Sequence, residues 1–322
     1  MGDPAGIGPE ITAKSLVSPE VQDRCQALVI GDFRILRKAL AEIGSSRPVR
    51  VFVDPGGIQF EAGVLSVLDT GSADPEKIQV GEPSAIGGKA VFEDLSLAVR
   101  LAREKRIDGV VLGPHNKYSV NLAGIFFAGY PPLIAKLTGS RFAFNMLVAG
   151  SFRIVGVTLH LALREVPLVL TVDLVEGAIE AAWTSVRRLG VPSPRIAVTG
   201  LNPHCGEEGL FGSEEETIIR PAIRAAQSKG MDVSGPFPAD SLFAGIEKKQ
   251  DYDVYVAMYH DQSHIPIKTI AFDHIVGFII GTPLVIATVG HGSAFDIAGK
   301  GRANPRPMME TIALVARSCQ SP

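Results

Sequence analysis

The chain has 322 residues, of which 46% are hydrophobic and 20% are charged. This balance excludes an intrinsically disordered protein and provides apolar material for about two domains. The 31 lysines and arginines do not exceed the 34 aspartates and glutamates, so a net charge of −3 leaves no cationic surplus for a nucleic-acid backbone. Three widely spaced cysteines exclude a disulfide framework, and neither a signal peptide nor a membrane-length apolar run is found. We therefore expect a cytoplasmic protein with no nucleic-acid or membrane partner.

Short β-branched runs alternate with longer amphipathic runs along the chain. The expected strands are 27–31, 49–53, 109–112, 153–158, 195–199 and 252–257, and the expected helices are 89–106, 172–189 and 213–229. Ser213 and Glu216 predict a capping box at the start of the last helix, and Gly230 predicts its end. Pro221 is expected in the first turn of that helix or at a kink. Apolar strands interleaved with helices predict an α/β fold whose sheets are covered on both faces.

Three of the predicted strands are followed by a histidine, at His160, His204 and His260. Parallel strands end at one edge of a sheet, so this pattern predicts a three-histidine metal site. The alternative is that each histidine only caps its own strand end. Asp240 and Asp261 are expected to orient a metal ligand or accept a proton, or to be ordinary surface carboxylates.

The run from His260 to His264 invites comparison with the two-histidine helix of zinc proteases. Its lead-in alternates like a strand, its second residue is aspartate rather than glutamate, and Pro266 follows at once. We therefore expect a strand end here and do not favour a protease.

A glycine-rich stretch covers residues 290–301. Its glycines allow the backbone to approach a flat ligand or a pyrophosphate closely, and Asp296 is suited to bind a ribose hydroxyl. The alternative is a tight turn that only joins two elements. The glycines near the N-terminus are not followed by Lys-Ser or Lys-Thr, so they do not form a nucleotide-binding P-loop.

Four stretches, at 1–11, 202–204, 259–262 and 291–301, resemble the 4-hydroxythreonine-4-phosphate dehydrogenase family in register. The last stretch also resembles the adenine-side loop of isopropylmalate and isocitrate dehydrogenases. The resemblance implies two α/β/α domains with the active site in the cleft between them. One domain would comprise residues 1–113 with 271–322 and carry the nucleotide loop. The other, residues 114–270, would carry the metal ligands and dimer contacts.

The same resemblance implies an NAD-linked dehydrogenase that oxidises a secondary hydroxyl of a hydroxy acid, with decarboxylation. A divalent metal would be held by the three histidines named above, with zinc preferred over magnesium, manganese or cobalt. The protein would be a homodimer whose partner helps to complete each site. Lys117, with Asp240 and Asp261, is expected to handle protons. The expected cofactor contacts are His291, Gly292, Ser293, Ala294, Asp296 and Asn304.

The substrate positions depart from the family pattern. Tyr130 and Pro131 stand where the family carries a His-Thr pair, and Lys268 keeps the family's substrate lysine. Gly277 and Ile286 replace an asparagine and an arginine, which removes anion contacts. The runs 129–131, 157–160, 264–268 and 289–294 resemble the terephthalate cis-dihydrodiol dehydrogenase branch. The apolar Ile286 and the aromatic ring of Tyr130 favour a non-phosphorylated, carboxylated cis-dihydrodiol as substrate, with 4-hydroxythreonine 4-phosphate of pyridoxal phosphate biosynthesis as the alternative.

Two other classes of protein remain open at this stage. Three histidines with a water in the fourth position would suit a zinc hydrolase, although the nucleotide-like loop argues against it. A non-catalytic binding protein that keeps the fold is the other alternative, and three retained metal histidines argue against that.

Overall fold

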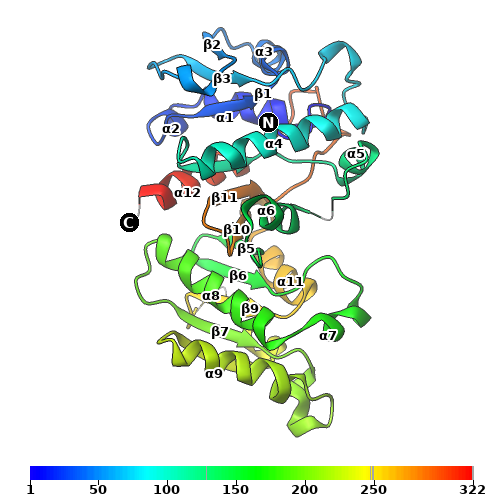
Figure 1. Cartoon of the computed structure of the whole chain (residues 1–322), viewed down its shortest axis with the longest axis vertical. Helices are drawn as coiled ribbons and strands as arrows, with labels where there is room; N and C mark the ends of the chain where they lie inside the picture. The colour runs from blue at the N-terminus through cyan, green and yellow to red at the C-terminus, as the bar shows by residue number, and fades with distance from the viewer. Residues whose placement is uncertain (128, 247, 249, 321–322) are drawn as a thin grey trace. The chain divides into compact units, whose positions relative to one another are not determined.

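The computed structural model describes residues 1–127, 129–246, 248 and 250–320. The chain divides into two compact units, each of which is described by itself (Figure 1). Unit 1 comprises residues 1–133 and 286–317, and unit 2 comprises residues 134–285 and the C-terminal residues from Ser318. Both divisions fall later in the chain than the predicted 113/114 and 270/271. The reason is that the helix at 117–122 packs on the long helix of unit 1, while the strand at 276–280 pairs within unit 2.

Unit 1 contains a parallel sheet in the strand order β1-β3-β2. Its strands are β1 (Leu28–Gly31), β2 (Val49–Phe52) and β3 (Leu65–Asp69), and β4 (Gly109–Leu112) is a neighbour of β11 (Val285–Val289). The helices are α1 (Gly8–Leu16), α2 (Pro19–Gln22), α3 (Phe33–Glu42), α4 (Ala85–Arg103) and α5 (Lys117–Leu122), while α6 (Tyr130–Thr138) and α12 (Arg306–Gln320) each cross the division. Buried residues of α1, α3, β3 and α12 share one core, which includes Ile11, Leu36, Val67 and Met308.

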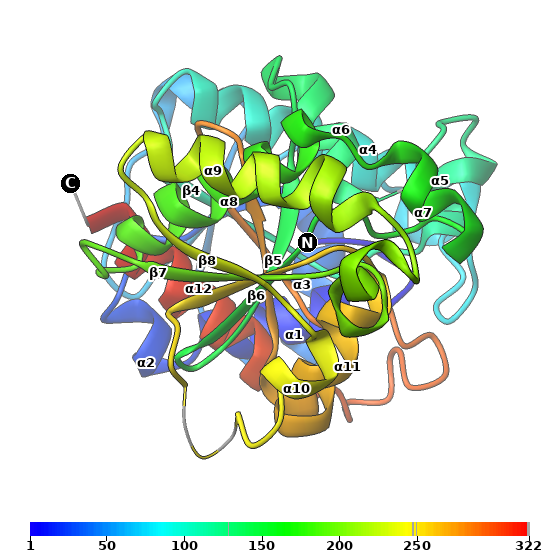
Figure 2. The same ribbon diagram turned by 90° about the horizontal axis from the view of Figure 1, so that it is seen from below.

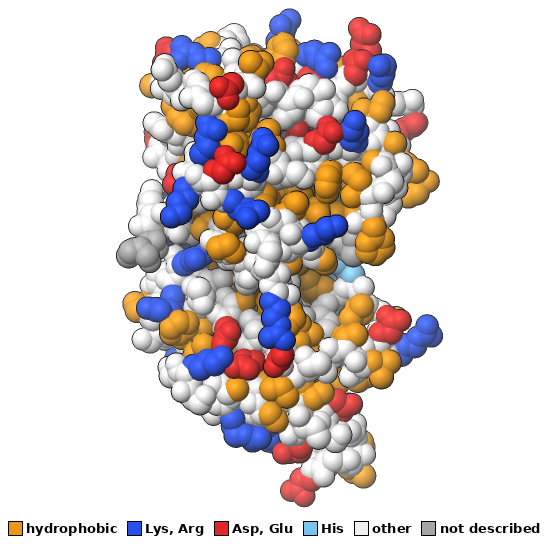
Figure 3. Space-filling model, in the orientation of Figure 1, with side chains coloured by type: hydrophobic (Ala, Val, Ile, Leu, Met, Phe, Trp, Pro, Cys, Tyr) orange, Lys and Arg blue, Asp and Glu red, His pale blue; other side chains and the backbone are white. Residues whose placement is uncertain are grey.

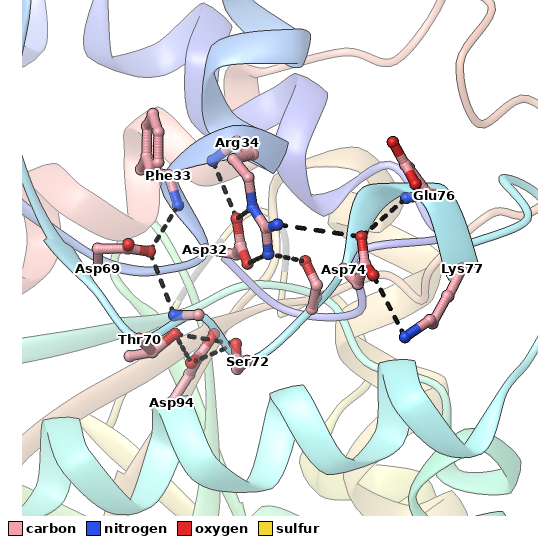
Figure 4. Close-up of polar contacts among 12 residues, drawn as sticks. Asp32, Phe33, Arg34, Asp69, Thr70, Ser72, Asp74, Glu76, Lys77 and Asp94 are labelled. Atoms are coloured by element: carbon pink, nitrogen blue, oxygen red, sulfur yellow. Dashed lines mark hydrogen bonds and ion pairs between the residues drawn. The ribbon is translucent and has the colours of Figure 1, made fainter.

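The carboxyl ends of β1 and β3 carry a polar network (Figure 4). Asp32 caps α3 by accepting from the Arg34 backbone N–H at 3.0 Å and pairs with the Arg34 guanidinium at 2.7 Å. Burial acts to raise the pKa of Asp32, but the hydrogen bonds and charge of Arg34 lower it overall. The buried Asp94 accepts from the hydroxyls of Thr70 at 2.8 Å and Ser72 at 3.0 Å. Asp69, at the end of β3, accepts from the Phe33 backbone N–H at 3.0 Å and so joins the ends of β3 and β1.

Unit 2 contains a mixed sheet in the order β10-β5-β6-β9-β7-β8. Strand β5 runs antiparallel to β10 and β6, whereas β6, β9, β7 and β8 are parallel. The strands are β5 (Phe144–Ala149), β6 (Phe152–Gly156), β7 (Arg195–Thr199), β8 (Asp232–Phe237), β9 (Val254–Ala257) and β10 (Val276–Ile280). Helices α8 (Val172–Arg188) and α9 (Arg220–Ser228) cover one face, and α10 (Ala239–Leu242) and α11 (His260–Ala271) lie on the other (Figure 2).

Several short elements complete the chain. A four-residue helix, α7, covers Val166–Val169, and a π-helix covers Glu215–Ile219. The 3₁₀ turns are Pro55–Gly57, Pro75–Lys77, Leu163–Glu165, Pro203–Gly209 and Phe272–His274.

All six predicted strands are present, with bounds shifted by one or two residues at some ends, and the α/β class is confirmed. The predicted helix at 213–229 begins as the π-helix and continues as α9, with Pro221 in the first turn of α9. The predicted capping box is wrong, because the backbone carbonyl of Ser213, not its hydroxyl, accepts from the Glu216 N–H at 3.1 Å. Gly230 has a φ of +82° and follows the C-cap residue Lys229, so the helix ends where predicted.

The expectation of a strand end at His260 is also wrong, because α11 begins there and runs through Pro266. A proline inside a helix removes one backbone hydrogen bond. The helix persists because it packs on β5, β6 and β9, where Ile267 is fully buried.

Within the described chain, no helix is both long and apolar enough to cross a bilayer. In the face drawn in Figure 3, lysines and arginines lie interspersed with aspartates and glutamates, which agrees with the small net charge.

Candidate active site

The three predicted metal histidines follow neighbouring parallel strands of unit 2. Strand β9 lies between β6 and β7, with Gly156 opposite Ala257 and Val198 opposite Val256. His160, His204 and His260 all come after the carboxyl ends of these strands. The structure therefore bears out the argument that the three segments emerge at one edge of the sheet.

Polar side chains hold these strand ends to one another. The Thr158 hydroxyl donates to the Met258 carbonyl at 2.8 Å, which joins the β6 and β9 segments. The Gln262 amide oxygen accepts from the Met258 N–H at 2.9 Å and the Thr199 hydroxyl at 3.1 Å. Its amide nitrogen donates to the Gly200 carbonyl at 2.9 Å. Gln262 thus joins the β9 and β7 segments, and sequence reasoning missed it, although it lies two residues beyond a predicted ligand.

Two of the three imidazoles lie close together. The rings of His160 and His260 have centroids 6.0 Å apart, and His264 stacks on His260 at 3.8 Å. Asp261 Oδ1 lies 2.7 Å from His260 Nδ1, and a carboxylate on one ring nitrogen is the usual orienting partner of a metal-binding imidazole. Burial and the neighbouring His260 lower the pKa of His264 to about 4, so His264 is neutral near pH 7.

The third histidine lies in an unusual backbone segment. His204, Cys205, Glu207 and Glu208 all have positive φ values between 44° and 55°, a conformation that costs energy for residues other than glycine. The buried Glu215 anchors the preceding residues by accepting from the Leu201 and Asn202 N–H groups, both at 2.8 Å. Neither the left-handed segment nor the anchoring carboxylate was expected from the sequence.

The three histidines are suitable metal ligands by residue type, but in this structure they are not arranged around a common point. Imidazole nitrogens are good ligands for zinc, and His260 has its orienting carboxylate. The His204 side chain is 70% exposed, with Nδ1 3.7 Å from Glu207 Oε2. In the described parts of the chain, no three His, Cys, Asp or Glu side chains are gathered as a metal site would require. The histidines fit a metal in kind and in strand-edge position, while His204 would have to turn away from Glu207.

The glycine-rich loop lies in unit 1. The Ile7 N–H donates to the Ser293 carbonyl at 2.9 Å, and Ser293 is buried. Ala294 has a φ of 42°, while Asp296 and Gly292 are exposed. His291 Nδ1 lies 3.0 Å from the Gly292 carbonyl. The Asn304 side chain accepts from the Arg306 N–H at 3.0 Å and so starts α12. Cofactor binding by these residues stays a prediction.

The residues predicted to accept or donate protons lie in the first turns of helices. Lys117 is the first residue of α5 and is exposed, and partial burial of its ammonium lowers its pKa. Asp240 is exposed on α10, and Asp261 is exposed on α11 beside His260. Lys268 is exposed on α11, the helix that begins with His260.

The four replaced substrate positions are buried. The Tyr130 hydroxyl donates to the Gly113 carbonyl at 3.0 Å, its ring packs against His115 at 4.1 Å, and burial raises its pKa. Pro131 lies in the first turn of α6. Gly277 pairs with Leu147 inside the sheet of unit 2, and Ile286 is fully buried in β11. These side chains offer little or no surface to a substrate in this conformation.

Comparison with known proteins identifies close relatives over nearly the whole chain. The family model described as "Pyridoxal phosphate biosynthetic protein PdxA" matches residues 23–315. A relative from Cupriavidus necator, named D-threonate 4-phosphate dehydrogenase, is 41% identical over 315 residues, which cover 97% of this chain and 93% of the relative.

Two solved structures are similar to this one. A 4-hydroxythreonine-4-phosphate dehydrogenase from Klebsiella pneumoniae has a TM-score of 0.86 and 37% identity, covering 99% of this chain and 98% of that one. A terephthalate 1,2-cis-dihydrodiol dehydrogenase from Burkholderia xenovorans has a TM-score of 0.70 and 35% identity, covering 98% and 96%. Both named activities are dehydrogenations, and the structural similarity is greater to the enzyme named for a phosphorylated substrate.

Proposed function

The chain belongs to the PdxA family, and from this premise we propose that it is an NAD(P)-linked dehydrogenase that oxidises a secondary hydroxyl of a phosphorylated four-carbon hydroxy acid. The observation that carries the proposal is the near full-length similarity to a D-threonate 4-phosphate dehydrogenase. The edge of the unit 2 sheet supports it, because three histidine-bearing segments emerge there. We place the active-site histidines at this edge.

The preference for a cis-dihydrodiol is not supported by the comparisons. It depended on Tyr130 and Ile286 facing the substrate, and both are buried. A phosphorylated acid instead needs cations. Lys268 is exposed on the helix that carries His260, and its charge contributes to lowering the pKa of His264, after burial and His260. We therefore assign the substrate anion to Lys268.

The histidines would hold a divalent cation, zinc by preference, which when bound polarises the substrate hydroxyl. Asp261 orients the His260 ring through Nδ1. Lys117 accepts the hydroxyl proton, and its lowered pKa increases the fraction in the neutral, basic form. The loop at 290–301 would hold NAD(P)⁺, with Asp296 on a ribose hydroxyl, and the bound cofactor would supply the hydride acceptor. Where the new ketone is β to the carboxylate, carbon dioxide can leave.

The direct test is NAD(P)H formation by metal-supplemented protein with D-threonate 4-phosphate, 4-hydroxy-L-threonine 4-phosphate and a terephthalate cis-dihydrodiol in parallel. We expect turnover of a phosphorylated substrate and none of the diol. K268M should raise KM for the phosphorylated substrate about tenfold or more, the usual loss for a charge-assisted contact of 1.5–3 kcal/mol. Turnover of the diol alone would overturn the substrate assignment.

We also propose that the protein is a homodimer, as the family resemblance implies. Leu163 and Leu168 lie in the segment that follows His160, and they are 67% and 81% exposed. An apolar segment beside a proposed active-site residue suits contact with a second copy of the chain.

A further inference from the structure

Helix α1 of unit 1 carries an ion pair that the proposed chemistry does not use. Lys14 Nζ lies 2.7 Å from Glu10 Oε1, and the two side chains are only 23% and 5% exposed. A Lys–Glu pair one turn apart on an open helix surface contributes a few tenths of a kcal/mol. This pair is instead largely covered by another segment of the chain.

The covering segment is the end of the glycine-rich loop and the residues directly after it, 301–303. Lys14 Nζ donates to the carbonyl oxygens of Gly301 at 2.9 Å and Ala303 at 2.8 Å. Glu10 Oε1 also accepts from the Ala303 backbone N–H at 2.8 Å. With the Glu10 contact, all three N–H donors of the ammonium are matched. The pair therefore binds the backbone of residues 301–303 through both a donor and an acceptor.

The beginning of the loop is held by the same N-terminal segment. The Ile7 N–H donates to the Ser293 carbonyl at 2.9 Å. A Cβ on Gly6 would come within 2.8 Å of Ser293, so only glycine permits this approach without a shift. Residues 6–14 thus contact the loop on both sides of residues 294–300.

The loop itself has little regular structure to stabilise its shape. Residues 295–301 form turns, and Ala294 has a φ of 42°, which is uncommon for alanine. Such conformations persist where the surroundings hold them. The contacts of residues 6–14 with Ser293 and with residues 301–303 hold the loop in this conformation.

We propose that Glu10 and Lys14 are positioning residues that hold the glycine-rich loop in its NAD-binding conformation, an inference that rests on the proposed function of this loop. They act through the backbone at 301–303 and do not touch the cofactor. Loss of the pair therefore increases the mobility of the loop and weakens binding of NAD more than any other step.

The kinetic test compares K14M with K89M. Lys89 and Glu93 form a similar i,i+4 pair at 3.6 Å on α4, but both side chains are exposed, at 66% and 46%. K14M should raise KM for NAD⁺ about tenfold while kcat and the substrate KM change less than about twofold. K89M should change none of them. E10Q keeps an oxygen acceptor for the Ala303 N–H but loses the charge beside Lys14, so we expect a smaller rise.

A second readout needs no turnover. Lys300 in the loop and Arg302 directly after it are exposed and are sites for trypsin. K14M should be cut there several times faster than wild type, with NAD⁺ slowing the cut in both proteins. Equal cutting and equal NAD⁺ KM in K14M and K89M would overturn the inference. If K14M fails to fold, E10Q decides by the same two measurements.

The variant D296N separates this inference from the proposed function. If NAD⁺ protects the wild-type loop and D296N reduces that protection, the loop is the cofactor site whatever K14M shows. If NAD⁺ neither protects the loop nor supports turnover, the proposed function fails, while faster cutting of K14M would still support the structural contact.

Discussion

Asp3 is a fully buried carboxyl group in the N-terminal loop of unit 1. Its Oδ1 accepts from the Ala5 N–H at 3.0 Å. Burial raises the pKa of Asp3 by more than the hydrogen bonds from Ala5 and Ser119 lower it. A carboxyl group whose pKa is higher in the folded than in the unfolded state favours folding when protonated, and this contribution is lost as the pH rises through the folded pKa.

We therefore expect D3N to be more stable than wild type near pH 8, because Asn keeps the oxygen acceptor without the buried charge. The gain should be about 1 kcal/mol, the typical size of the effect of one substitution on stability, or roughly 2 °C in Tm. The difference should shrink near pH 4. Thermal melts at both pH values test this, with D54N as the control, since Asp54 is exposed and also accepts from a backbone N–H. A lower Tm for D3N at both pH values would contradict it.

Among the elements, the π-helix Glu215–Ile219 positions the segment before His204. Glu215 is 1% exposed and accepts from two backbone N–H groups and from the Asn202 side chain at 3.0 Å. A Cβ on Gly206 would lie 2.9 Å from Glu215 Oε2, so the loop closes tightly over this carboxylate. Such π-turns often occur at functional sites.

E215A should leave the Leu201 and Asn202 N–H groups without their acceptor and cost roughly 3 kcal/mol in the free energy of unfolding. Zinc affinity should fall as well, because His204 would no longer be held near the sheet edge. E215Q keeps one oxygen acceptor and should lose less of both. Denaturant unfolding and competition with a zinc chelator test this. E216Q, which alters an exposed pair with Arg220, should match wild type, and unchanged zinc affinity in E215A would contradict the prediction.

The strands could be predicted because each is a short apolar run whose pattern is local. The same pattern predicted that the histidine segments emerge at one edge of the sheet, because it locates both the end of each strand and the residues that come after it. The π-helix and the left-handed turn at His204 depend on Glu215, which lies beyond that turn in the chain. Helix α11 was not predicted, because Pro266 argued against a helix there. The packing of the buried Ile267 outweighs the effect of that proline. Local patterns do not contain these tertiary contacts.

The substitutions at substrate positions show a second limit. Ile286 and Tyr130 differ from the family pattern, and their side chains were expected to shape the substrate site. Both side chains are buried and belong to the packed interior, so their identity is determined by packing and does not indicate the substrate. The contact of Lys14 with residues 301–303 spans most of the chain length, and no sequence spacing predicts it.

At the scale of the whole molecule, the proposed homodimer can be tested through the leucines that follow His160. L168D places a charge where a side chain is 81% exposed. In an isolated chain this change should be nearly neutral, because exposed substitutions usually alter stability by less than about 0.5 kcal/mol. In a dimer that buries Leu168 the charge should disrupt association. The control V53D changes an 84% exposed valine in unit 1.

Light scattering after size exclusion should give wild type and V53D twice the 34.2 kDa mass of the chain. L168D should shift toward the monomer mass at the same concentration and lose turnover in parallel, since the partner is proposed to complete each site. Raising the protein concentration should restore both together by mass action. A monomeric, fully active wild type would exclude the shared site, and a dimeric, active L168D would place the interface elsewhere.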